Sequence, residues 1–172
     1  GFEADEVIAT LARSCSNEGR PCYIISGDKD LLQLIEGPVK LLLPEKGDYR
    51  ELGREEVYQK VGVYPEQIID YLSLIGDSAD NIPGVKGIGP KTAVTLLEKY
   101  KTLDTIYENL DSLPSGQRKK LEENRDNAYL SRELIVLDLT VPLDLNSDQL
   151  TVQRLNIEAA VPIFIEQEIK SI

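Results

Sequence analysis

The stretch "LIGDSADNIPGVKGIGPKTAVTLLEKY", residues 74–100, is the most informative part of the sequence about the fold. Its apolar start ends a predicted helix at Gly76, and a new helix is predicted to begin with Pro90 at its first position. The Gly-Ile-Gly at 87–89 permits a tight turn and lets backbone N–H groups approach a phosphate closely. A plain turn between two helices explains the glycines alone. Glycines with lysines on both sides favour a helix-hairpin-helix, which holds a DNA backbone without reading its sequence.

The charge of the chain is unevenly distributed. The formal net charge of −11 argues against a protein that coats nucleic acid nonspecifically. Residues 81–101 nevertheless carry four lysines and a single glutamate, so a locally basic segment surrounds the predicted hairpin. We expect contacts with a DNA backbone from Lys86, Gly87, Gly89, Lys91 and Thr92.

The composition excludes several kinds of chemistry. The chain has no histidine, which excludes a Ser-His-Asp triad, a Cys-His pair and any zinc site that needs histidine. Its two cysteines form no disulfide framework and indicate reduced thiols. No apolar run approaches the roughly 18 residues of a membrane-spanning helix, and the first residues do not resemble a signal peptide. We therefore expect a cytoplasmic, nucleoid-associated protein.

Upstream of residue 63 the pattern predicts part of an α/β layer. Helical and strand-like segments alternate there, which is typical of a parallel sheet with crossover connections. The predicted elements are a helix over 4–15, a strand over 21–26, a helical turn over 30–35, a strand over 39–43, a turn-rich connection over 44–51 and a helix over 54–62.

Downstream of residue 63 the pattern is helical. Helices are predicted over 65–75, 90–100, 103–110, 116–125 and 127–137, followed by an extended segment near 139–145 and a last helix over 154–169 with Pro162 at a kink or a start. We expect three units: the C-terminal half of an α/β core (1–63), a helical DNA-binding module (64–138) and a C-terminal segment that packs back on the core (139–172).

Three acidic clusters mark ends of predicted elements, and each has an ordinary structural explanation. Acids in "EADE" (3–6) favour the dipole of the first helix. Asp30 in "GDKD" (27–30) could cap a helical turn, and Asp and Asn in "GDSADN" (76–81) are common turn formers. However, Asp28 and Asp30 share a face of an extended segment and repel each other unless a cation lies between them.

Together the clusters predict a site for hard divalent cations. Ligation by carboxylates alone suits Mg²⁺ or Mn²⁺ rather than Zn²⁺. Two such ions about 4 Å apart are the recurring apparatus of phosphodiester hydrolysis. The predicted ligands are Glu3, Asp5, Glu6, Asp28, Asp30, Asp77 and Asp80.

The blocks "GFEADEVIATLA" (1–12), "YIISGDKDLLQL" (23–34) and residues 74–100 together resemble the 5′ nuclease domain of bacterial DNA polymerase I and, more broadly, the flap endonuclease family. Their order and spacing match, and "ENRDNAYLSRELIVLDLTVPLDL" (123–145) is similar to the downstream segment of the family. The resemblance implies a parallel α/β core of the PIN-like or Rossmann-like kind joined to a helical three-turn DNA-binding module.

The resemblance also implies roles for residues. The catalytic carboxylates would be Glu3, Asp5, Asp28, Asp30, Asp77 and Asp80. Glu6 departs from the family, whose polymerase-type members usually have Asp there, and its longer side chain could bind a metal through water. Carbonyls around Val85 and Ile88 resemble a monovalent cation site, where K⁺ helps to seat a DNA phosphate.

The activity implied is 5′-3′ exonuclease and flap endonuclease activity on 5′-flap or primer DNA, in replication and repair, with a polymerase domain as a possible fusion partner. Family members have an upstream portion with a first strand, further aspartates and a helical arch. We therefore expect these 172 residues to be a fragment with weak activity or none. The alternatives are a non-catalytic module that binds duplex DNA through its hairpin and carries a degenerate acidic cluster, and a PIN-like RNase, which the hairpin disfavours.

Overall fold

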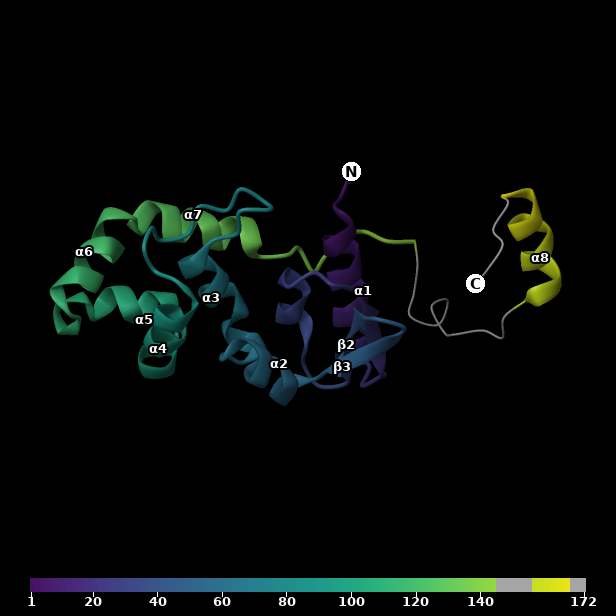
Figure 1. Cartoon of the computed structure of the whole chain (residues 1–172), viewed down its shortest axis with the longest axis horizontal. Coiled ribbons are helices and arrows are strands. Elements are labelled where there is room, and N and C mark those ends of the chain that lie inside the picture. The colour runs from purple at the N-terminus through teal and green to yellow at the C-terminus, as the bar shows by residue number, and fades with distance from the viewer. Residues whose placement is uncertain (145–155, 168–172) are drawn as a thin grey trace.

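The computed structural model of the chain describes residues 1–144 and 156–167. Its first part is a small α/β layer, which lies in the middle of Figure 1, and its second part is an array of helices that extends from one side of this layer. The elements of the first part are α1 (Ala4–Asn17), β1 (Cys22–Ile25), the short 3₁₀ helix η1 (Asp30–Leu34), β2 (Val39–Glu45), β3 (Asp48–Leu52) and α2 (Arg54–Val61).

The sheet has the order β1-β2-β3 and is mixed. β1 pairs with β2 in parallel, in a register that sets Cys22 opposite Val39, as the alternation of elements predicted. The prediction of a turn-rich connection over 44–51 was wrong, because β3 pairs with β2 antiparallel. Gly47, with φ of +79°, makes the tight turn between them. The side chains of β3 before Leu52 are exposed, so this strand has no apolar alternation that the sequence could show.

The helical part follows the prediction closely. Its elements are the 3₁₀ helix η2 (Pro65–Gln67), α3 (Ile68–Ile75), α4 (Pro90–Tyr100), α5 (Leu103–Glu108), the 3₁₀ helix η3 (Leu110–Ser112), α6 (Ser115–Glu123) and α7 (Arg125–Ile135). α3 packs against α4, α7 and η1, and five of its residues are buried. One hydrophobic core therefore runs from the sheet into the helices through α3.

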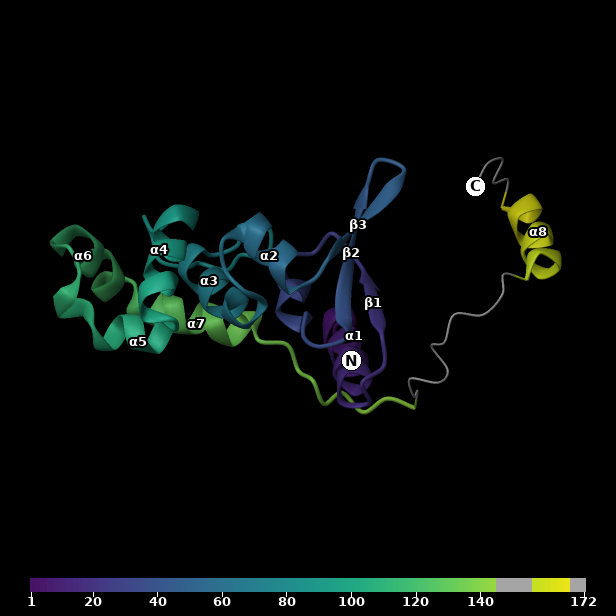
Figure 2. The ribbon, with the colours of Figure 1, turned by 90° about the horizontal axis from the view of Figure 1, so that it is seen from below.

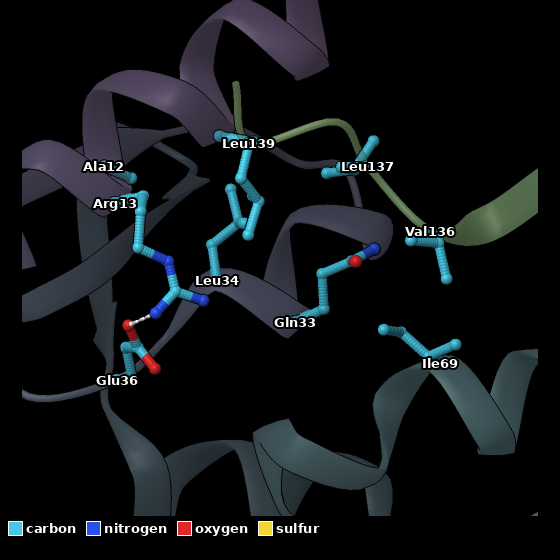
Figure 3. A pocket seen from close by; sticks show the side chains of 10 residues that line it. Ala12, Arg13, Gln33, Leu34, Glu36, Ile69, Val136, Leu137 and Leu139 are labelled. Carbon is cyan, nitrogen blue, oxygen red and sulfur yellow. Dashed lines mark hydrogen bonds and ion pairs between the residues drawn. The ribbon is translucent and has the colours of Figure 1, made fainter. Parts of the chain in front are cut away.

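A small cavity marks the junction of the two parts. It has a volume of about 130 Å³ and lies between α1, η1, α3 and the linker that follows α7 (Figure 3). On one side the Arg13 guanidinium donates a hydrogen bond of 2.7 Å to the Glu36 carboxylate. The Gln33 amide donates to the carbonyls of Asp30 and Ile135, at 2.9 and 3.0 Å. Gln33 thus ties the end of α7 to η1 and fixes the helical part relative to the strand ends.

The chain returns to α1 after α7. The N–H of Val141 donates to Thr10 Oγ1 over 3.1 Å, and the Val141 side chain is buried. No strand forms over 139–144, and residue 145 of the predicted extended segment lies outside the described residues.

The last described helix is α8 (Ile157–Glu166), with Pro162 inside it. None of its residues is buried, and Figures 1 and 2 show it apart from the other elements. The ends of the predicted helix over 154–169 lie outside the described residues. Among the residues that the structure describes, no helix is both long and apolar enough to cross a membrane.

Candidate functional site

Five of the seven predicted carboxylates line one pocket. It has a volume of about 310 Å³, and its apolar side includes Ile82 and Ile135. Three separate segments supply the acids: the start of α1, the turn after β1 and the loop after α3. The lining carboxylates are Glu3, Asp5, Asp28, Asp30 and Asp80. Residues far apart in the sequence therefore concentrate negative charge where a parallel strand ends, as in other open α/β sheets that bind ligands at this edge.

The acids of this pocket are close enough to perturb one another. Burial first, and then the charges of Asp28, Asp77 and Asp80, raise the pKa of Asp30 to about 6. The pKa of Asp5 is raised by burial first and then by neighbouring carboxylates, of which Asp28 is the first. Mutual repulsion of this kind favours protonation or the binding of a cation.

The turn after β1 sets the direction of the two aspartates. Ser26 Oγ accepts a hydrogen bond from the N–H of Asp28 over 3.0 Å. The Asp28 carboxylate then accepts the N–H of Asp30 over 2.9 Å, at the start of η1. Asp30 therefore does not use its carboxylate to cap η1, and its Oδ1 is buried with no hydrogen-bond partner in the described structure. An orphaned buried oxygen here suits a ligand that accepts electron pairs.

Two of the seven predicted ligands lie outside the pocket lining. Glu6 closes a capping box at the start of α1, where its carboxylate accepts the N–H of Glu3 over 3.0 Å. Asp77 is buried, and its Oδ2 lies 2.5 Å from the Lys29 ammonium. The ion pair with Lys29 lowers the pKa of Asp77. No local pattern indicates this pair, because Lys29 and Asp77 lie 48 positions apart in the sequence.

The acids do not form a finished metal cage. Within residues 1–144 and 156–167, no group of three or more carboxylates or thiols has the arrangement that holds a metal ion. The donors nevertheless fit a hard cation, because they are all carboxylate oxygens and one of them, Asp30 Oδ1, lacks any partner. Side-chain rotation, bridging water or further ligands would have to complete the coordination.

The predicted hairpin lies between α3 and α4. The N–H of Val85 donates to the carbonyl of Leu74 over 2.8 Å, and the N–H of Ile88 donates to that of Val85 over 3.0 Å. Buried Val85 and Ile88 anchor the turn, and Gly87 takes a φ of +85°. The predicted backbone-contacting residues Lys86, Gly87, Gly89 and Lys91 are exposed, and Thr92 is half-buried.

A residue of the hairpin surface that the sequence did not reveal is Lys120 of α6. Its ammonium donates to the Gly87 carbonyl over 2.9 Å. A side chain at position 87 would approach Lys120 Cε to 3.1 Å, so the glycine also makes room for this lysine. The separation of 33 positions explains why no local pattern could pair them.

Two protein-family models divide the chain between them. The model described as "5'-3' exonuclease, N-terminal resolvase-like domain" matches residues 1–62. The model described as "5'-3' exonuclease, C-terminal SAM fold" matches residues 63–158. The two models thus cover the α/β layer and the helical array in turn.

Curated relatives extend well beyond this chain. DNA polymerase I of Caldicellulosiruptor bescii is 42% identical over 176 residues, which span 100% of this chain and 21% of that protein. The 5′-3′ exonuclease of Bacillus subtilis is 43% identical over 145 residues, which span 83% of this chain and 49% of that protein. The chain therefore spans less than half of either relative.

Solved structures show the same fold. The phage T5 5′-exonuclease with bound divalent zinc ions superposes with a TM-score of 0.68 at 25% identity, over 80% of this chain and 51% of that one. The catalytic core of Rad2 in complex with DNA substrate superposes with a TM-score of 0.58 at 18% identity, over 97% of this chain and 57% of that one. The carboxylate pocket, the hairpin and both family matches agree, and the chain belongs to the 5′-3′ exonuclease family.

Proposed function

We propose that the chain is part of a metal-dependent 5′ nuclease that hydrolyses DNA at 5′ flaps and primer ends. The observation that carries this proposal is the meeting of five carboxylates from three segments in one pocket. The same chain carries the hairpin between α3 and α4, which is proposed to bind DNA. A nuclease needs both features, because one part must hold the backbone while another acts on a single phosphodiester bond.

The carboxylates have distinct tasks in this proposal. Glu3 and Asp5 would hold the first ion, Asp28 and Asp30 would supply ligands from the end of β1, and Asp77 and Asp80 would supply ligands from the loop before the hairpin, with Glu6 acting through water. Bound Mg²⁺ or Mn²⁺ would activate water and offset the charge that develops on the phosphate. The residues themselves position that chemistry at the end of β1, beside the apolar wall of Ile82 and Ile135.

The hairpin supplies DNA binding. Its exposed lysines, the free N–H groups at the start of α4 and that helix's dipole favour a phosphate, without selecting a base. Carbonyls of Val85 and Ile88 would take K⁺ there, next to the Gly87 carbonyl that Lys120 already contacts. The polymerase relatives support fusion to a polymerase domain as a further proposal.

The experiment is a chimaera with the B. subtilis 5′-3′ exonuclease, in which the aligned stretch of this chain replaces its counterpart. We expect the chimaera to cleave a 5′-flap duplex in Mg²⁺, and we expect the isolated chain to be weak or inactive. Asp28→Asn in the chimaera should lower the cleavage rate by about 10²-fold or more, with DNA affinity nearly unchanged, because it removes one negative ligand.

Asp126→Asn is the matched control, because it removes the same charge at an exposed position at the start of α7, away from the pocket. We expect its cleavage rate to equal that of the parent chimaera. Unchanged cleavage by the Asp28 variant would refute the metal assignment.

A second function is favoured by one observation, the lack of a preformed metal-binding group in the described residues. In this alternative the chain binds duplex DNA through its hairpin and the acids are catalytically silent. A chimaera that binds DNA with full affinity but does not cleave it in Mg²⁺ or Mn²⁺ would support this alternative.

A further inference from the structure

The ion pair between Lys29 and Asp77 joins the two parts of the molecule. Lys29 lies between the two aspartates that follow β1, and Asp77 opens the loop after α3. Lys29 Nζ and Asp77 Oδ2 are 2.5 Å apart. The side chain of Asp77 is 4% exposed, whereas that of Lys29 is 51% exposed. A fixed, buried carboxylate is thus paired with a cation that reaches in from solvent.

Asp77 depends on this cation. Its Oδ1 accepts the N–H of Ala79 over 2.9 Å, but its buried Oδ2 receives no hydrogen bond of good geometry in the described structure. The charge on Oδ2 is therefore met by the ammonium alone. Because an unpaired buried carboxylate is strongly unfavourable, some cation must stand at this position.

The surroundings of Lys29 favour a cation as well. The ammonium is attracted first by Asp77 and then by the charges of Asp30 and Asp80. Asp30 and Asp80 line the pocket proposed to bind a divalent ion. A lysine and a divalent ion would therefore draw on the same negative charge.

We propose that Lys29 is a positioning residue, which holds the Asp77 carboxylate while the divalent ion is absent and which that ion displaces. This inference rests on the proposed function, since it needs a divalent ion in the acidic pocket. Lys29 can leave because its flexible stem is half exposed, whereas Asp77 is held by its own loop, where Asp77 and Ile82 exchange backbone hydrogen bonds of 2.7 and 2.9 Å. The pair keeps this loop docked at the strand end without metal.

The alternative is a permanent structural pair that survives metal binding. The two cases predict opposite changes in Mn²⁺ affinity when Lys29 is replaced. Removing a competitor strengthens the binding of the ion, whereas removing a permanent support loosens Asp77 and weakens binding. Direct measurement of Mn²⁺ binding separates them without any assay of cleavage.

The experiment is a Mn²⁺ titration of the 172-residue chain, with free Mn²⁺ followed by electron paramagnetic resonance. We expect Lys29→Met to lower the half-saturating Mn²⁺ concentration about fivefold, the size of a modest ion-pair contribution. The matched control is Lys60→Met, which removes the same charge. Lys60 is exposed and, like Lys29, lines a second pocket beside α3. We expect the control to shift the value by about twofold at most, through long-range charge alone.

A second pair of variants tests the route through Asp77. In an Asp77→Asn background, Lys29→Met should shift Mn²⁺ binding no more than Lys60→Met does. Lys29→Gln serves if Lys29→Met does not fold, since its neutral amide can still donate to the buried carboxylate. Thermal melting gives a second measurement. Without Mn²⁺ the Lys29 variant should melt at a lower temperature than wild type, and saturating Mn²⁺ should raise its melting temperature more than it raises that of wild type.

The outcomes separate the two proposals. Equal or weaker Mn²⁺ binding by the Lys29 variants, with clear binding by wild type, overturns the role of Lys29 and leaves the proposed function standing. No detectable Mn²⁺ binding by wild type or by any variant overturns the role of Lys29, and the proposed function then stands or falls on flap cleavage by the chimaera.

Discussion

At the scale of single residues, two glycines decide whether the acidic loop can close. Gly76 and Gly84 have φ of +72° and +60° and lie back to back at the two ends of the loop that carries Asp77 and Asp80. A Cβ added to Gly84 would lie 2.4 Å from the backbone nitrogen of Gly76. The backbone itself is in the way, so no side-chain rotation can relieve the clash.

We therefore predict that Gly84→Ala destabilises the fold by about 2 kcal/mol or more, because strain at positive φ adds to the steric clash. Urea unfolding followed by circular dichroism measures this change. Gly116→Ala is the control, because Gly116 lies in α6 with nothing within 4 Å of its added Cβ. It should stabilise the fold by about 0.5 kcal/mol through helix propensity. Equal stability of the two variants would contradict the predicted clash.

At the scale of elements, a side chain of α7 holds the loop before α4 in place. The Oγ of Ser131, which is fully buried in α7, accepts the N–H of Gly84 over 2.9 Å and donates to the Asn127 carbonyl over 2.7 Å. The N–H of Gly84 is thus satisfied by a side chain 47 positions away. Without that acceptor it would be buried and unpaired.

Ser131→Ala should cost about 1–3 kcal/mol, the penalty for an unsatisfied buried donor. It should also speed amide hydrogen exchange at Gly84 more than in the centre of α4. Ser73→Ala is the matched control. Ser73 is equally buried, but its hydroxyl only donates to the Ile69 carbonyl in its own helix. A loss of stability as large in the Ser73 variant would show that the cross-helix bond is not the cause.

Which elements could be predicted from the sequence depends on whether their buried positions form a regular pattern. Helices with an apolar stripe, such as α1 and α4, were predicted within a few residues, because the period of buried positions is written in the sequence. β3 was missed because its exposed residues carry no such pattern and its pairing depends on β2. The clustering of the acids was predicted because each of them lies at the end of a predicted element. The partner of Lys29 could not be predicted, because that contact depends on how α3 packs against η1.

At the scale of the whole molecule, the proposed DNA binding has to overcome the strongly negative charge of the chain. The net charge of −11 repels a phosphate backbone, so the few lysines at the hairpin must act locally. We predict that Lys91→Ala weakens duplex binding and lowers the slope of log K against log salt by about one unit. Fluorescence anisotropy at several salt concentrations measures both.

Lys119→Ala is the control for this prediction, because Lys119 is exposed on α6 and pairs with Glu123 over 3.7 Å. Its removal changes the net charge equally and should leave the slope within about 0.3 of the wild-type value. Equal slopes for wild type and the Lys91 variant would remove Lys91 from the DNA contact.

The open side of β1 has a consequence for how the molecule behaves at high concentration. Among the described residues β1 pairs with β2 alone, and its Tyr23 and Ile25 side chains are 54% and 61% exposed. A row of unsatisfied amides beside apolar side chains is a template on which another polypeptide can build. In a concentrated solution of this chain, the exposed edges of β1 from two copies can pair with each other, so this edge favours self-association.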